Sequence, residues 1–219
     1  MERHVLVVLP HPDDESFGVA GVIAKYTQEG TPVTYVCATL GEMGRNMGNP
    51  FFANRETLPE VRKKELENAC AVLGIDDLRL LGMRDKTLEF EDPEEFADRI
   101  STIIEEVNPS LIITFYPGHG IHPDHDACAE AVVRAVSRLP EKDRPPLHCQ
   151  AIREDSEEVL GKPDVIVDVS DVLETKIAAI HAHRTQFEGI LSEFGMETDT
   201  QNPELREWLA RETFWVYEF

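Results

Sequence analysis

The sequence predicts an α/β fold in which a mostly parallel β-sheet lies between two layers of helices. Short apolar runs alternate along the chain with longer segments of helical periodicity, which is the order that βαβ units require. Residues 33–39 are apolar almost throughout, as is typical of a strand covered on both faces. The 219 residues contain no Pro/Gly/Ser-rich linker and no internal repeat, so we expect a single domain over residues 1–219.

The first elements expected are a strand at residues 5–9, which is an unbroken apolar run, and a helix at residues 17–28. The apolar strand at 33–39 follows. Residues 40–58 then contain three glycines and a proline and predict a loop. A loop of this length within a compact domain usually indicates function or mobility.

After this loop, helices and strands continue to alternate. The helix at 123–139 carries alanine and valine at i, i+3, i+4 and i+7 spacing from Ala129, and Pro123 suits its first position. The other expected elements are helices at 59–73, 93–107 and 171–184, and strands at 78–81, 111–115, 147–152, 165–169 and 214–217. Together these elements predict a Rossmann-like three-layer sandwich.

Three carboxylates and an imidazole follow the first expected strand, at His11, Asp13, Asp14 and Glu15. In open α/β sheets, ligand sites form at the carboxyl ends of the strands, and this segment stands at such a junction. A phosphate-binding turn would need glycines here, whereas carboxylates repel phosphate and attract a cation. The segment therefore predicts a metal site.

A second segment, His122-Pro123-Asp124-His125, follows the expected strand at 111–115. With Pro123 at the first helical position, His122 falls near the N-cap of the next helix. His125 then lies in the first helical turn, on the same face as the apolar stripe. We expect His125 to point inward, toward the sheet.

Because parallel strands end at the same edge of a sheet, we expect His11, Asp14 and His125 to meet there. Two imidazoles and one carboxylate form a three-ligand set for zinc that leaves a fourth position open. Each part also has a simpler explanation, since acidic residues and Ser16 favour a helix N-terminus and a lone histidine is usually a hydrogen-bonded core residue. A ligand pair of His125 and Cys128 is a weaker interpretation. Capping does not explain the His-Pro pair, and the two segments together favour a metal.

The segments at 11–15 and 122–125 resemble the two signature motifs of the PIG-L/LmbE-like zinc-dependent N-acetylglucosamine de-N-acetylases. Residues 39–42 and 62–66 also resemble segments of that family in the expected order, and the resemblance extends through most of the chain. Within the family, the chain is most similar to the bacillithiol biosynthesis deacetylases, which remove acetate from N-acetylglucosaminyl-malate. The motif pair indicates the family and does not select the substrate within it.

The expected cofactor is Zn²⁺, which Fe²⁺ could replace in the cell because mixed histidine and carboxylate ligands select weakly between them. Zinc lowers the pKa of a bound water to about 7, and amide hydrolysis also needs a base. Asp13, beside the ligand Asp14, is expected to be that base, as the resemblance also implies. His122 would hydrogen-bond the oxyanion and then protonate the leaving amine. Asp124 would orient or charge His122, and a plain acid in the first helical turn is the alternative.

Four residues are candidates for substrate binding. Arg62 is in line with the apolar face of the helix at 59–73, where a cation near the N-terminus is unfavourable, and the matching family arginine contacts the sugar. Alternatively, its stem covers the sheet while its head reaches water. Arg45 and Arg55, in the long loop, are weaker candidates for a substrate carboxylate. His183 stands where the family often has a histidine or tyrosine near the pocket, although a surface histidine fits equally well.

Composition excludes several classes of function. The 42 acidic and 21 basic residues give a formal net charge of −21, which argues against nucleic acid or an anionic membrane as a partner. Four scattered cysteines without a C-x-x-C pair indicate reduced packing residues. No apolar run is long enough for a signal peptide core or a membrane span, so we expect a cytoplasmic protein.

The favoured function is zinc-dependent hydrolysis of the N-acetyl group of a small-molecule amino-sugar conjugate, with N-acetylglucosaminyl-malate as the expected substrate. A general amino-sugar conjugate deacetylase is the alternative within this class. A metal phosphoesterase is disfavoured because it would usually need a second metal. A non-catalytic sugar-binding protein would not need Asp13 and His122 beside the ligands. A homo-oligomer is compatible with the sequence, which does not determine the oligomeric state.

Overall fold

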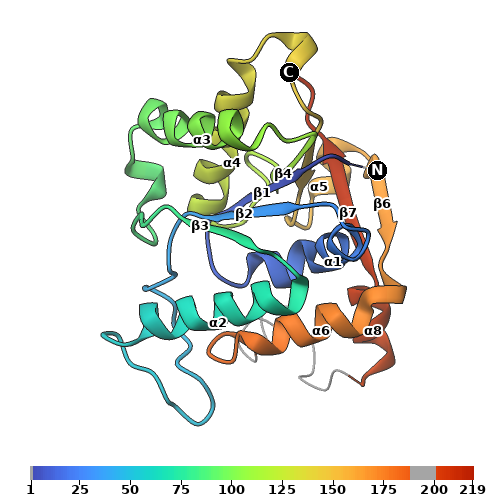
Figure 1. Cartoon of the computed structure of the whole chain (residues 1–219). Helices are drawn as coiled ribbons and strands as arrows, with labels where there is room; N and C mark the ends of the chain where they lie inside the picture. Colours follow the sequence, from blue (N-terminus) through green and yellow to red (C-terminus); the bar gives the residue numbers. More distant parts are fainter. Residues whose placement is uncertain (1, 188–200) are drawn as a thin grey trace.

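The computed structural model describes residues 2–187 and 201–219, and it has three layers (Figure 1). A seven-stranded sheet forms the middle layer, and helices cover both of its faces. This arrangement confirms the predicted α/β class with a mostly parallel sheet. None of the described helices is long and apolar enough to cross a membrane.

The strands, in chain order, are β1 (Val5–Leu9), β2 (Val33–Cys37), β3 (Asp77–Leu80), β4 (Leu111–Phe115), β5 (Leu147–Gln150), β6 (Val165–Asp168) and β7 (Arg211–Val216). Their order in the sheet is β3-β2-β1-β4-β5-β7-β6. Strands β1 to β5 run parallel, whereas β7 is antiparallel to both of its neighbours. Every residue of β1, β2 and β4 is buried, as the apolar runs predict for central strands.

The helices are α1 (Ala20–Gln28), α2 (Leu58–Leu73), α3 (Pro93–Val107), α4 (Pro123–Ser137), α5 (Ser156–Leu160), α6 (Leu173–Ala182) and α8 (Pro203–Leu209), with the short turns η1 (Glu15–Val19), η2 (Leu88–Phe90), η3 (Glu141–Asp143) and η4 (Ser170–Val172). Helices α1, α2, α6 and α8 lie on one face of the sheet, and α3 and α4 on the other (Figure 1). The helix expected at 17–28 is replaced in its first part by η1, a single π-helical turn. Helices α5 and α8 were not expected, because such short segments carry no clear periodic signal.

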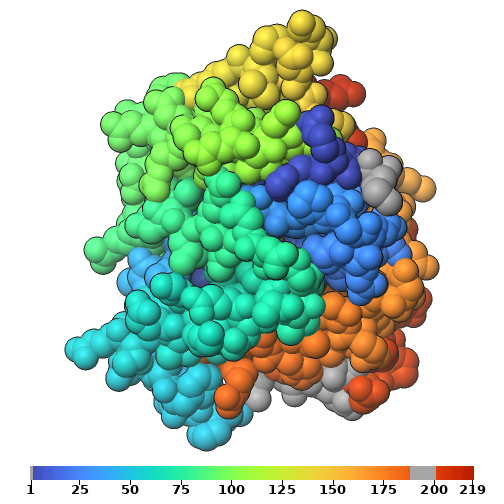
Figure 2. Space-filling view, viewed as in Figure 1, coloured from blue at the N-terminus to red at the C-terminus, as the bar shows by residue number. Residues whose placement is uncertain are grey.

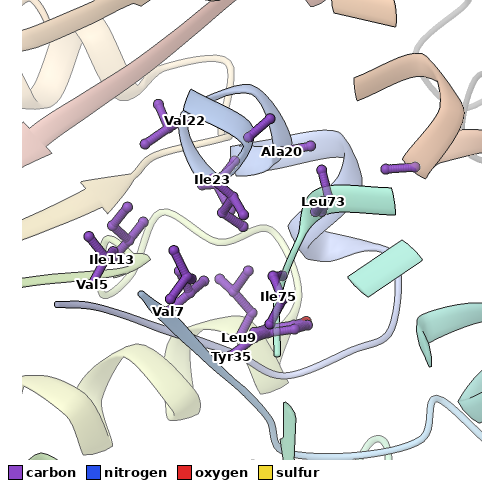
Figure 3. Close-up of a cluster of buried hydrophobic side chains, with 14 of the residues drawn as sticks. Val5, Val7, Leu9, Ala20, Val22, Ile23, Tyr35, Leu73, Ile75 and Ile113 are labelled. Carbon is purple, nitrogen blue, oxygen red and sulfur yellow. The ribbon is translucent and has the colours of Figure 1, made fainter. Parts of the chain in front are cut away.

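Side chains of β1 alternate between two apolar cores. Val5, Val7 and Leu9 lie against apolar side chains of α1 and α2 (Figure 3). Leu6 and Val8 point the opposite way and pack with side chains of α3 and α4. The four cysteines divide between the same cores, and they are buried and unpaired, as predicted. Packing on both faces fixes β1, and with it the start of the segment that follows.

The two motif segments meet because β1 and β4 are hydrogen-bonded neighbours in the middle of the sheet. Each segment follows one of these strands at its carboxyl end. Because β7 is antiparallel, its first residue, Arg211, lies at the same edge. The expected long loop is also present, since residues 38–57 form no helix or strand. This loop, in light blue, projects from the lower left of the molecule in Figure 2.

Candidate metal centre and active site

Three side chains from the two motif segments converge at this edge of the sheet. The Nδ1 atom of His11 lies 3.2 Å from Nε2 of His125, and oxygens of Asp14 lie 3.6 Å and 3.4 Å from these two nitrogens. In the described part of the chain, this group has ligand atoms close enough together to hold one metal ion. The structure thus brings together the three residues that the sequence proposes as ligands.

The outer ring nitrogens show which lone pairs point into this cluster. His11 Nε2 lies 3.2 Å from oxygens of both Asp85 and Asp124, and His125 Nδ1 lies 2.6 Å from the carbonyl oxygen of Gly120. Because ionised carboxylates and carbonyls only accept, these outer nitrogens carry the protons. Two imidazole lone pairs therefore face the Asp14 carboxylate, whose Oδ2 accepts from the His11 backbone N–H at 2.9 Å, and a cation stabilises this arrangement.

The spacing and the charge of the cluster also suit a small divalent ion. Bonds of about 2.0–2.1 Å in a tetrahedral site place neighbouring ligand atoms roughly 3.3 Å apart. This is close to the separations of 3.2, 3.4 and 3.6 Å between the three ligands. Burial lowers the pKa of His11, but its hydrogen bonds to Asp124 and Asp85 outweigh burial and raise that pKa to about 10. Burial likewise opposes ionisation of Asp14, yet His125 and His11 lower the pKa of its carboxyl group. The field around the three ligands thus favours positive charge between them, either as a proton on His11 Nδ1 or as a metal ion that replaces this proton and exposes the lone pair.

Asp124 directs its hydrogen bonds to groups other than His122. Its fully buried carboxylate accepts from the backbone N–H groups of Lys86 and Leu88, at 2.7 and 3.1 Å, and meets Nε2 of His11. The ring of His122 is instead oriented by the backbone, because its Nδ1 accepts from the Asp124 N–H at 3.1 Å and caps α4. Burial lowers the pKa of His122, and the charge of Asp124 opposes this shift, although the two side chains share no hydrogen bond. Asp124 is not a plain acid on a helix surface, because the chain after β3 folds over it.

Arg62 is bound to Asp13. Its Nη2 donates to Asp13 Oδ2 at 2.7 Å and to the carbonyl of Pro12, and its Nη1 donates to the carbonyl of Gly41 at 2.8 Å. Arg62 is only 4% exposed, which contradicts the alternative of a head group that reaches water. A Cβ at Gly41 would lie 1.8 Å from Nη1, and its φ of +59° also favours glycine. Burial raises the pKa of Asp13 to about 6, and Arg62 opposes this rise.

Glu15 and His183 form a buried pair next to Asp13. His183 Nε2 lies 2.6 Å from Glu15 Oε1, and neither side chain reaches solvent. The other carboxylate oxygen of Glu15 accepts from the Asp13 backbone N–H at 3.0 Å and from the Tyr35 hydroxyl at 3.2 Å. The alternative of a surface histidine at position 183 is wrong, because α6 ends inside the protein. The acidic residues at 13–15 do not cap the following helix, because neither η1 nor α1 has a hydrogen bond from the side chain of its N-cap residue.

A cavity of about 560 Å³ opens at the carboxyl ends of β1 and β4, which is within the usual size range of small-molecule sites. Arg45, Arg55 and His183 do not line it, and Arg55 instead donates to the carbonyl of Gly44 at 2.7 Å. Asp124 does not line the cavity either, and its carboxylate contacts the outer ring nitrogen of His11. The predicted site residues that do line the cavity are His11, Asp13, Asp14, Arg62, His122 and His125.

Three residues of the cavity wall hold a backbone conformation that L-residues rarely adopt. The φ angle is 109° at Asp13, 63° at Lys86 and 64° at Ile121, which is also β-branched. Such strain persists only where the surrounding structure enforces it, and it clusters at functional sites. The strained backbone thus marks the same cavity as the candidate ligands His11, Asp14 and His125.

Sequence reasoning missed two features of this site. Burial opposes ionisation of Asp85, but its hydrogen bond with His11 lowers its pKa to about 2. Its place just after β3, at the same sheet edge, was the signal available. Lys176 and Glu212 form a buried ion pair of 2.7 Å in the cavity wall, and Glu212 also accepts from two backbone N–H groups at the start of α1. These residues are distant in sequence, and no local pattern indicates that they pair.

Residues 6–136 match the model of a protein family described as GlcNAc-PI de-N-acetylase (PIG-L). A Bacillus subtilis (strain 168) protein named probable N-acetyl-alpha-D-glucosaminyl L-malate deacetylase 2 is 58% identical over 219 residues, covering 100% of this chain and 99% of that protein. A protein of the same name from Bacillus cereus (strain ATCC 14579) is 55% identical and is covered over 100% of both chains.

A solved structure is similar over most of its length. The N,N'-diacetylchitobiose deacetylase from Pyrococcus horikoshii aligns with a TM-score of 0.77 at 25% identity, covering 99% of this chain and 84% of that chain. The region that matches the family model contains both motif segments.

Proposed function

The chain belongs to the GlcNAc-PI de-N-acetylase (PIG-L) family, and we propose that it hydrolyses the N-acetyl group of N-acetylglucosaminyl-malate. The relatives that carry this substrate in their names match the chain over its whole length at 58% and 55% identity. The volume of the cavity supports the proposal, because it suits a sugar with one small substituent. The products would be acetate and a free amino sugar conjugate.

We propose that His11 Nδ1, His125 Nε2 and the Asp14 carboxylate hold one zinc ion. The observation that carries this assignment is the convergence of two imidazole nitrogens and one carboxylate within 3.6 Å of one another. When bound, the metal would supply hydroxide near neutral pH by lowering the pKa of a water molecule. The same mixed ligand set suits Fe²⁺, so the identity of the ion belongs to the proposal.

In this proposal Asp13 carries the proton transfers. Its carboxylate takes the proton of the attacking water and passes it to the leaving amine. Arg62 and the backbone bond to Glu15 hold Asp13 in place beside Asp14, so we assign Arg62 the task of positioning Asp13. This differs from the expectation that Arg62 mainly contacts the sugar, because its Nη1 and Nη2 atoms already donate within the protein.

His122 would stabilise charge on the amide oxygen. Because its Nδ1 accepts a backbone N–H, the ring proton lies on Nε2, and the neutral ring can donate a hydrogen bond. A neutral imidazole has no second proton to give to the amine, so the expected role of His122 as proton donor passes to Asp13. Asp124 would hold the His11 ring in the orientation that directs Nδ1 toward the metal.

The direct test is release of a free amine from N-acetylglucosaminyl-malate by the purified protein, beside a panel of other N-acetylglucosamine conjugates. We expect turnover of the malate conjugate that stops after chelation and returns when zinc is added. Turnover of other conjugates without the malate conjugate would favour a general deacetylase. Absence of amine release from every conjugate would contradict the proposed reaction.

Replacing His125 by Ala is expected to remove most of the bound metal, because two ligands hold zinc much more weakly than three. Elemental analysis after dialysis measures this, and His148→Ala, in β5, is a control in which the metal content should not change. Full metal occupancy in the His125→Ala protein would refute the ligand set.

Replacing Asp124 by Asn is expected to weaken metal binding about 10- to 100-fold, the usual effect of losing a partner of a metal-bound histidine. The amide keeps the size of the carboxylate and loses the charge that faces His11 Nε2. Competition with a chelating indicator measures the affinity. A slower reaction with unchanged metal affinity would instead favour the role predicted from the sequence, in which Asp124 orients or charges His122.

A further inference from the structure

Four cationic residues line the cavity in the described part of the chain, and they are not equivalent. The guanidinium of Arg62 and the ammonium of Lys176 are buried, and each is paired with a carboxylate. The side chains of Lys86 and Arg211 are exposed and make no hydrogen bond or ion pair within the described residues. In a chain with a formal net charge of −21, two unpaired cations in one cavity are available to an anionic ligand.

The surroundings separate these two cations. Lys86 follows Asp85, and its own backbone N–H is bound by Asp124, so an anion beside it would face two carboxylates. The carboxylate next to Arg211 in sequence is that of Glu212, which is neutralised by Lys176 and by two backbone N–H groups of α1. Asp168, which faces Arg211 across the sheet, is exposed, so water screens its charge, and an anion is therefore repelled less beside Arg211 than beside Lys86.

The fold does not use the charge of Arg211. Asp168 faces Arg211 across the pairing of β6 and β7, where opposite charges often interact. The two side chains nevertheless form no ion pair, and Asp168 instead accepts from the backbone N–H of Ser170 at 2.9 Å. The guanidinium is thus left to the cavity, where Trp208 and Thr213 also line the wall.

The position of Arg211 in the sheet suits the far end of a substrate. It begins β7, which is two strands from β4 at the edge that carries the metal cluster. Neighbouring strands are about 4.8 Å apart, so β7 lies roughly 10 Å from β4. A glucosamine ring bound by its N-acetyl group at the cluster, together with an acid on the adjacent anomeric carbon and the long arginine side chain, can span this distance.

We propose that Arg211 binds a carboxylate of the group attached to the sugar and makes the enzyme selective for acidic N-acetylglucosamine conjugates. The proposal rests on the proposed deacetylase function and names its specificity residue. Arginine suits this task because its planar donor fork pairs with both oxygens of a carboxylate. Arg45 and Arg55, the expected candidates, are exposed in the long loop and do not line the cavity.

The test compares Arg211→Gln with the unmodified enzyme on two substrates of nearly equal size. One is the malate conjugate, and the other is its diamide, in which an uncharged amide replaces each carboxylate. We expect kcat/KM for the malate conjugate to fall about 10- to 100-fold and kcat/KM for the diamide to stay within about twofold. The difference should shrink at high salt, and Arg211→Lys should recover part of the loss. Arg45→Gln is the charge-matched control and should leave both values unchanged.

Equal losses on both substrates, or no loss on the malate conjugate, would overturn the proposal, as would a malate-specific loss in Arg45→Gln or in Lys86→Gln. Calorimetric binding of the malate conjugate to the metal-loaded Asp13→Asn protein, with and without Arg211→Gln, gives a readout that does not depend on turnover. If the unmodified protein binds that conjugate through Arg211 but releases no amine from either substrate, the proposed function fails and the acidic subsite stands. If the Arg211→Gln protein turns over the malate conjugate as fast as the unmodified enzyme does, the proposed function stands and the acidic subsite at Arg211 fails.

Discussion

The Asp13→Asn protein is expected to keep its metal and its fold and to deacetylate about two to four orders of magnitude more slowly, the usual effect of losing a general base. An amide cannot take the proton of the attacking water. It still offers an oxygen to Arg62 Nη2, and the backbone N–H of residue 13 still reaches Glu15. The loss should therefore appear in kcat, with little change in KM, and elemental analysis should find the metal at its normal content.

The matched control for this prediction is Asp76→Asn, which removes the same charge from an exposed aspartate between α2 and β3. It should retain full activity. If Asp13→Asn also retains nearly full activity, another group takes the proton, and Asp13 serves only to neutralise Arg62. If instead the Asp13→Asn protein loses its metal, Asp13 contributes to metal binding, and the assignment of Asp14 as the ligand and Asp13 as the base is wrong.

The central part of this site could be predicted because it depends on local sequence and on one rule of topology. His11 stands just after β1, and His125 lies in the first turn of α4, the helix that follows β4, so their approach depends mainly on the parallel pairing of β1 with β4. Apolar runs predict buried strands, and the carboxyl ends of adjacent parallel strands coincide. The cap formed by His122 was predictable for a similar reason, because Pro123 fixes the first helical position.

The side-chain partners could not be predicted, because they depend on how loops from other strands fold over the site. Asp124 binds His11 rather than its near neighbour His122 because the segment after β3 supplies two N–H groups to it. The pairing of Arg62 with Asp13 likewise requires α2 to begin opposite the first motif. Periodicity identified the buried face of that helix, but it contains no information on which acid lies across from it.

The antiparallel placement of β7 had the largest consequence that the sequence did not reveal. Only its second half was expected as a strand, and its insertion between β5 and β6 has no local signal. This placement carries Arg211 to the cavity and brings Glu212, from the last tenth of the chain, to the start of α1 in its first tenth. Contacts at such sequence separation are set by the assembled sheet.

Glu212 is expected to matter most for stability, because its carboxylate has three roles in one buried position. It lies 2.7 Å from Lys176 Nζ, and both side chains are almost completely buried. Its two oxygens also accept from the backbone N–H groups of Gly21 and Val22, each at 2.8 Å. These N–H groups stand in the first turn of α1, where no side chain of that helix caps them. The carboxylate of Glu212 thus connects β7 to α1 through two hydrogen bonds and to α6 through the ion pair.

Replacing Glu212 by Ala is therefore expected to lower the free energy of unfolding by about 3–5 kcal/mol, as in other buried pairs that lose one partner. The ammonium of Lys176 would be left buried without a counter-charge, which costs more than the lost attraction itself. Urea denaturation at constant metal occupancy measures the change. The exposed pair Arg79–Glu106 provides the control, because Glu106→Ala should change stability by less than about 1 kcal/mol.

The double variant Lys176→Met with Glu212→Gln separates the charge from the packing. If the unpaired ammonium causes most of the loss, this variant should be more stable than Glu212→Ala, because it contains no buried charge and the single amide oxygen of Gln still accepts from one of the two N–H groups of α1. If both variants are equally unstable, the geometry of the carboxylate at the start of α1 dominates instead. If Glu212→Ala unfolds within about 1 kcal/mol of the unmodified protein, water must reach Lys176 through the cavity, and the pair contributes no more than one at the surface.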